Sequence, residues 1–146
     1  MYAGGGFCFF NIGQYSFAVC LNKLTMEVIK MFSENKSTVI LITRQGMGDA
    51  EQPLPMKLVQ TYLTLLNDSN TLPDVICFYT AGVKLTVEGS PIIELLRAIE
   101  AKGVRLILCG TCLNFYGLTE RVQVGIVGGM TDIIEAQRRA DKVISL

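Results

Sequence analysis

The chain has 146 residues, of which 50% are hydrophobic and 18% charged, and its 13 basic and 13 acidic side chains give a formal net charge of zero. This length and hydrophobic content predict one packed globular domain, and the balanced charge disfavours nucleic-acid binding, which needs a basic surface. Histidine is absent, which excludes serine–histidine and cysteine–histidine dyads and histidine-ligated metals, and we expect neither a metal nor another cofactor.

The first 22 residues carry no charged side chain and are rich in apolar ones. No basic residue precedes Lys23, as a signal peptide would require, and Gly4–Gly6, Asn11 and Gln14 interrupt the segment too often for a membrane-spanning helix. We therefore expect no membrane insertion. Residues 1–36 are interpreted as an apolar arm of unknown role, with a short amphipathic helix at 24–33.

The regular part of the sequence begins at Thr38. Residues 38–43 form a continuous β-branched apolar run, which is typical of a strand covered on both faces. A loop with glycines follows at 44–52, and a helix is predicted from Pro53 or Pro55 to about Asn67. The apolar stripe that marks this helix consists of Leu54, Leu58, Tyr62 and Leu65.

A second buried strand is predicted at residues 75–79, followed by a loop or short turn at 80–89. Ser90 is a candidate N-cap for the next helix, Pro91 fits its first turn, and Gly103 ends it in a left-handed conformation. The apolar stripe of this helix consists of Ile92, Leu95, Leu96 and Ile99.

A third strand at 104–108 runs directly into the sequence Cys109-Gly110-Thr111-Cys112. A short strand within 122–127, a helix from Thr131 or Asp132, and a last strand at 142–146 complete the chain. Strands that alternate with helices predict an open, mostly parallel sheet covered on both faces, in a three-layer α/β/α domain over residues 37–146.

Five cysteines, an odd number, stand mostly inside apolar runs, which favours a reducing compartment and a cytoplasmic protein. Cys8, Cys20 and Cys77 are expected to be small buried hydrophobic residues. Cys109 and Cys112 are different because they follow a strand, at the edge of a parallel sheet where ligands bind. We expect the backbone N–H groups of the following turn to point at the Cys109 sulfur, lower its pKa and favour the thiolate that accepts and holds a persulfide.

The C-x-x-C spacing leaves other interpretations open. A dithiol redox switch would form a disulfide between Cys109 and Cys112, whereas a zinc site would need two more ligands that the sequence does not offer. A non-catalytic scaffold or binding module of the same fold is the remaining hypothesis. Side chains or backbone expected to support the site are those of Lys84, Gly48, Asp49, Gly110, Thr111 and Asn114.

Three stretches of the sequence, TAGVKLTVEG at 80–89, CGTCLNFYGL at 109–118 and GMTDIIEAQRRADKVI at 129–144, resemble the DsrE/DsrF-like family. They are most similar to the branch of this family found at the C-terminus of YedF proteins. The resemblance extends over about Thr38 to Leu146 and implies a flavodoxin-like fold assembled into trimers or hexamers. It also implies a role in sulfur relay, or in selenium metabolism, in which Cys109 accepts persulfide sulfur.

The sequence departs from YedF proteins at two places. Residues 1–36 contain no proline, so the Cys-Pro-x-Pro motif of the TusA-like domain that precedes the YedF branch is missing. Gly48 and Asp49 are followed by Pro53 and Pro55, which the family does not lead us to expect. We therefore expect the sulfur donor to be another protein, such as a TusA-like carrier, or a small molecule.

Overall fold

A five-stranded parallel sheet, with the strand order β4-β3-β2-β1-β5, forms the centre of the computed structural model, which describes residues 36–69 and 71–146. The described residues belong to one unit, Lys36–Leu146. The predicted helix at 24–33, Cys8 and Cys20 lie outside them. The strands are β1 (Thr38–Ile42), β2 (Val75–Phe78), β3 (Arg105–Cys109), β4 (Ile126–Gly128) and β5 (Lys142–Ser145).

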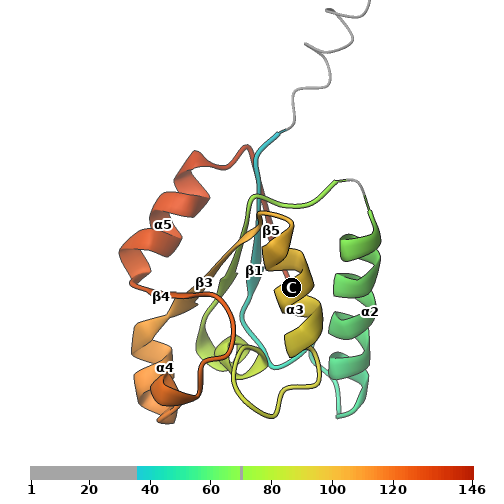
Figure 1. Ribbon diagram of the computed structural model, residues 1–146, viewed down its shortest axis with the longest axis vertical. Helices are drawn as coiled ribbons and strands as arrows, with labels where there is room; N and C mark the ends of the chain where they lie inside the picture. The colour runs from blue at the N-terminus through green and yellow to red at the C-terminus, as the bar shows by residue number, and fades with distance from the viewer. Residues whose placement is uncertain (1–35, 70) are drawn as a thin grey trace, which may run out of the picture. The chain divides into compact units, whose positions relative to one another are not determined.

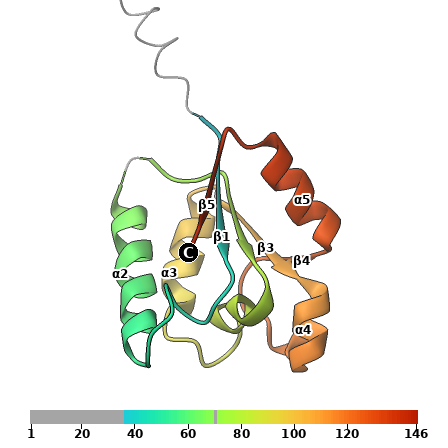
Figure 2. The ribbon, with the colours of Figure 1, turned by 180° about the vertical axis from the view of Figure 1, so that it is seen from behind.

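Helices cover the sheet on both sides (Figures 1 and 2). Helices α2 and α3 lie on one side, and α5 lies on the other with the short helix α4. The predicted three-layer α/β/α architecture with a parallel sheet is therefore confirmed. The helices are α2 (Leu54–Asp68), α3 (Ile93–Ala101), α4 (Gly110–Tyr116) and α5 (Met130–Arg139), and the 3₁₀ turns are η1 (Thr80–Leu85) and η2 (Thr119–Arg121).

The core lies between the central strands and their helices. All four residues of β2 are buried, and so are four of the five residues of β1, as their continuous apolar sequences predict. Side chains that are less than 2% exposed include Ile42, Phe78 and Leu108. The three central strands are thus fixed from both faces, and so are the positions of the residues at their ends.

Helix α2 forms where predicted, but most of the stripe that marks it in the sequence faces outward. Leu54 is 51% exposed, Leu58 44% and Leu65 66%, whereas Tyr62 is partly buried against the core and the buried residues are Pro55, Val59 and Leu63. The Met47 N–H donates to the Pro55 carbonyl at 2.9 Å, and a Cβ on Gly46 would lie 2.5 Å from the Pro55 Cβ, so the first turn of α2 is held against the preceding loop.

Two boundaries differ from the prediction. Ser90 does not cap α3, because the helix begins at Ile93 after Ile92, and no side chain provides a cap. The fourth strand is shifted to 126–128, since Gly125 makes a turn at φ +86° and its hydrogens pack against Leu106 and Leu108. The left-handed conformation predicted for Gly103 is confirmed by its φ of +96°.

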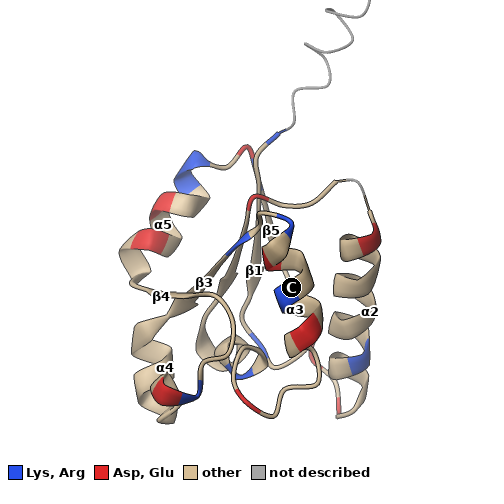
Figure 3. Ribbon diagram, viewed as in Figure 1, with Lys and Arg blue, Asp and Glu red and all other residues tan. Residues whose placement is uncertain are grey.

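Acidic and basic residues are spread over several helices and loops (Figure 3). None of the helices in residues 36–69 and 71–146 is long and apolar enough to cross a membrane.

Candidate functional site

Cys109 is the last residue of β3 and the residue that precedes α4, at the carboxyl end of the sheet. It pairs in register with Gly128 of β4 and is only 1% exposed. Helix α4 begins at Gly110, directly after Cys109, and no backbone N–H of its first turn bonds to the Cys109 sulfur. The expected support of the sulfur by these N–H groups is thus not formed, because the side chain is buried in the core instead.

Cys112 lies one helical turn further along α4 and is partly exposed. Its Sγ accepts a hydrogen bond of 3.1 Å from the backbone N–H of Thr80. Burial raises the pKa of Cys112, the neighbouring Cys109 thiol raises it further, and the Thr80 N–H lowers it.

Thr80 has a strained backbone. Its φ is +49°, which is rare for any residue except glycine and costs a β-branched residue about 1–3 kcal/mol. The conformation is held by its hydroxyl, whose single proton is shared between the carbonyl oxygens of Thr43 and Tyr79. In this conformation the backbone N–H of Thr80, an exposed residue, is directed at the Cys112 sulfur. Sequence analysis missed Thr80, because nothing in a loop sequence marks a threonine with positive φ.

The turn η1 is pressed against the end of β1. The Gly82 N–H donates to the Thr43 carbonyl at 3.2 Å, and a Cβ on Gly82 would lie 2.1 Å from the Ile42 carbonyl oxygen. Glycine is therefore required at this position for the two backbones to approach. The close packing fixes η1, and with it the Thr80 N–H, relative to the sheet.

Lys84, also in η1, places its Nζ 4.3 Å from the centre of the Tyr116 ring. Tyr116 follows Cys112 by four residues, so both side chains lie on the same face of α4. Lys84 thus lies near the site, as predicted, but it contacts the ring of Tyr116 and not a thiol. The two side chains border a cavity of about 360 Å³, which is lined by Gln45, Lys84, Val87, Glu88, Gly89, Ser90, Pro91, Tyr116 and Leu118.

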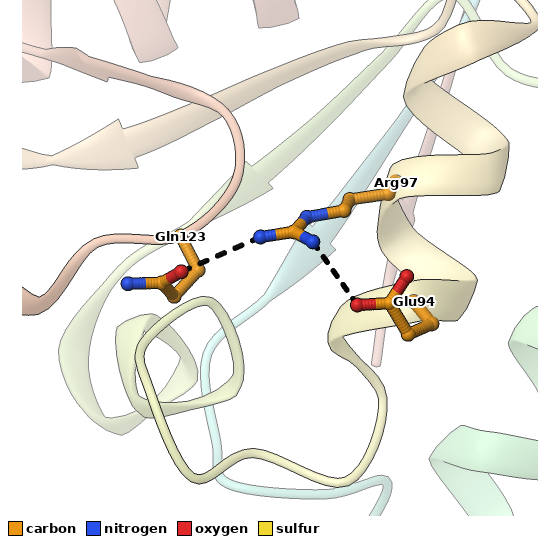
Figure 4. A network of polar contacts seen from close by, with 3 residues as sticks. All are labelled: Glu94, Arg97 and Gln123. Atoms are coloured by element: carbon orange, nitrogen blue, oxygen red, sulfur yellow. Dashed lines mark hydrogen bonds and ion pairs between the residues drawn. The ribbon is translucent and has the colours of Figure 1, made fainter.

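The far wall of this cavity is fixed by bonds between distant parts of the chain. Val87 and Val122 form an isolated antiparallel bridge, and the Gln123 N–H donates to the Thr86 carbonyl at 3.0 Å. Arg97 of α3 bonds both Glu94 at 3.1 Å and the Gln123 side chain at 3.4 Å (Figure 4). The loop that follows η1 is therefore tied to the segment before β4 and to α3.

The other predicted site residues are distributed unevenly. Gly110 and Thr111 lie in the first turn of α4, and a Cβ on Gly110 would be 3.3 Å from Val127. Asn114 is turned toward η2, where its Oδ1 accepts a bond of 2.8 Å from Thr119. Asp49 forms an exposed ion pair with Arg44 at 3.4 Å, and the Cβ position of Gly48 has no atom within 4 Å. Asp49 and Asn114 thus bond to Arg44 and Thr119 and not to either thiol.

Cys77 is fully buried in β2, as expected of a small hydrophobic residue. Burial raises its pKa to about 11, although the charge of Arg105 partly opposes this change. A second cavity of about 450 Å³ lies between α5 and the sheet, and none of the three described cysteines lines it. Within residues 36–69 and 71–146, no three His, Cys, Asp or Glu residues are grouped to hold a metal ion.

Comparison with known proteins supports the resemblance stated above. The model of the DsrE/DsrF-like family matches residues 36–146. The crystal structure of the ychN protein from E. coli is similar to this chain with a TM-score of 0.59 and 20% sequence identity, over 76% of this chain and 99% of that one. No curated protein matched the sequence. Residues 36–146 carry the family match and the fold is shared with ychN, and the chain belongs to the DsrE/DsrF-like family.

Proposed function

We propose that this protein is a sulfur carrier that holds sulfane sulfur as a persulfide on Cys109. The observation that carries the proposal is the placement of two cysteines at the carboxyl end of the sheet, with Cys109 as the last residue of β3 and Cys112 one helical turn along α4, where the Thr80 N–H donates to its Sγ at 3.1 Å. Membership of a family linked to sulfur relay supports the same assignment. Selenium in place of sulfur would use the same position.

The loading step is a thiol exchange. The Cys109 thiolate attacks the outer sulfur of a donor R–S–SH, a new S–S bond forms, and the S–S bond of the donor breaks. The inner sulfur of the donor leaves with the electron pair of the broken bond as RS⁻. The step therefore needs no additional oxidant or reductant.

The burial of Cys109 has a consequence for this step. A side chain that is 1% exposed cannot meet a donor unless Cys112 or the start of α4 moves aside. We expect loading to be slower than for an exposed thiol, and the bound persulfide to be shielded from other thiols. The donor would be a carrier protein of the TusA-like kind or a small molecule.

Intact-protein mass spectrometry after incubation with a persulfide donor tests the proposal. The wild type should gain the mass of one sulfur, Cys109→Ser should gain none, and the matched control Cys77→Ala should behave as the wild type. Loading that persists in Cys109→Ser would refute the assignment. The absence of loading in the wild type would favour a non-catalytic module, for which the burial of Cys109 is the supporting observation.

The position of Cys112 one helical turn after Cys109 also favours a dithiol redox switch as a second candidate. Attack of Cys112 on a Cys109 persulfide would form the Cys109–Cys112 disulfide and release HS⁻, and a dithiol reductant would restore the pair. A reversible titration of the disulfide against a glutathione buffer would support this candidate. A wild type that stays reduced across the titration would contradict it.

A further inference from the structure

We propose that the cavity of about 360 Å³ beside Lys84 and Tyr116 binds the anionic end of a small-molecule persulfide, the donor for Cys109. This inference rests on the function proposed above and specifies the class of its substrate. The volume is within the range of cavities that hold small ligands, which is about 300–1,000 Å³. A donor with a carboxylate at one end and a persulfide at the other is the class that fits.

The charge of the cavity favours an anion. Lys84 forms no ion pair among the described residues, and its Nζ lies 4.3 Å from the centre of the Tyr116 ring. Glu88, the carboxylate in the lining, is paired with Arg121 at 3.5 Å. Because that ion pair is neutral, the charge of Lys84 gives the lining of the cavity a net charge of +1. The ammonium group of Lys84 also has three N–H donors for an anionic ligand.

Ser90 supplies a second, independent observation. Its Oγ is buried, and the described residues provide no hydrogen-bond partner for it, although Ser90 belongs to the lining of the cavity. A buried hydroxyl without a hydrogen-bond partner costs free energy. A ligand carboxylate that accepts a hydrogen bond from this hydroxyl would recover that free energy. The hydroxyl is not used to cap α3, so the fold itself gives it no structural bond.

Two elements that line the cavity, η1 and α4, also contact or carry the cysteines. Lys84 belongs to η1, whose Thr80 bonds Cys112, and Tyr116 belongs to α4, one turn after Cys112. A ligand held by Lys84 therefore lies next to the two elements that cover the thiols. None of the three described cysteines lines the cavity, so with the carboxylate at Lys84 and Ser90 the persulfide end would extend out of it along α4 toward Cys112 and Cys109.

Loading kinetics with two donors test the inference. Glutathione persulfide carries carboxylates, whereas the persulfide of 2-mercaptoethanol carries no other charged group. We expect Lys84→Gln to raise the half-saturating concentration of glutathione persulfide at least tenfold and to change loading by the uncharged donor less than twofold. Lys84→Arg should keep the half-saturating concentration of glutathione persulfide close to that of the wild type. The control Lys57→Gln, on the exposed side of α2, should have no effect.

Ser90→Ala provides a readout that a purely structural role would not produce. We expect weaker saturation by glutathione persulfide together with an unchanged or higher Tm, because an unpaired buried hydroxyl is removed. A lower Tm with unchanged saturation would overturn the role of Ser90.

Binding is also measured without any sulfur transfer. In an NMR titration of the reduced protein with glutathione, we expect the amide signals of Gln45, Lys84 and Ser90 to shift, and Lys84→Gln to abolish the shifts. Equal binding by wild type and Lys84→Gln, or no binding by the wild type, overturns the proposed cavity whatever the loading result. Glutathione binding without loading by any donor refutes the persulfide function and, with it, the identity of the ligand as a donor.

Discussion

At the scale of single residues, the site consists of two thiols with different environments and one strained backbone N–H. Cys109 is buried and Cys112 is partly exposed, and Thr80 reaches only the second of them. The sequence predicted the position of both cysteines, because a C-x-x-C after a buried apolar run marks the end of a parallel strand. It could not predict Thr80, because the +49° φ of that residue is imposed by the packing of η1 on β1.

The pKa of Cys112 should depend on its neighbour. Cys109→Ala removes the neighbouring thiol, which adds to burial in raising this pKa, and leaves the Thr80 N–H that lowers it. We expect the alkylation of Cys112 by iodoacetamide, followed by peptide mass spectrometry from pH 7 to 11, to reach its half-maximal rate at a lower pH than in the wild type. An unchanged or higher midpoint would mean that the two thiols do not interact.

Cys77 should make the protein less stable at high pH. Its pKa rises from 9.0 to about 11 in the fold, so the unfolded chain loses this proton first and is favoured as the pH passes 9. The stabilisation present below pH 9 is lost by pH 11, and amounts to about 2 kcal/mol from a shift of this size. Urea unfolding at pH 8 and pH 10.5 should show the loss in the wild type and a smaller one in Cys77→Ala; equal losses would contradict the account.

At the scale of elements, the strands were more predictable than the faces of the helices. Strands β1 and β2 are continuous apolar runs, and β3 is one after Arg105, a pattern typical of strands in a parallel sheet. Helix α2 has apolar residues on more than one face, and which of them are buried depends on tertiary packing, such as the close approach of Pro55 to Gly46. Ser90 is a second case in which the local sequence was not sufficient. Its residue type favours an N-cap position, but α3 begins at Ile93 and Ile92 occupies the N-cap position.

A pair of substitutions tests which face of α2 packs. Leu63→Ala should lower the free energy of unfolding by about 3 kcal/mol, because the side chain is fully buried. Leu58→Ala, at a position 44% exposed, should change it by less than about 0.5 kcal/mol. Chemical denaturation of both variants measures the difference, and a larger loss for Leu58→Ala would show that the outer stripe is the one covered in solution.

At the scale of the whole molecule, the two faces of the sheet are covered unequally. Helices α2 and α3, of 15 and 9 residues, pack on one face, and α5 and α4, of 10 and 7 residues, pack on the other (Figures 1 and 2). Large apolar side chains remain exposed on β4, α5 and β5. They are Ile126, Val127, Met130, Ile134 and Val143.

Self-association is the expected consequence of these side chains and of a net charge of zero. We expect light scattering on a size-exclusion column to give a mass several times 16.0 kDa, in keeping with a trimer or hexamer. Ile134→Lys, which places a charge at the centre of α5, should lower the measured mass. A wild-type mass of one chain at tens of micromolar protein would contradict this expectation.

The position of the sulfur atom tests the central claim most directly. Trypsin releases Cys109 and Cys112 together in the peptide 106–121, and fragmentation between Gly110 and Thr111 separates them. After loading with a persulfide donor and alkylation at low pH, tandem mass spectrometry of this peptide should place the extra sulfur on Cys109. Extra sulfur on Cys112 alone, or on neither residue, would contradict a Cys109 persulfide.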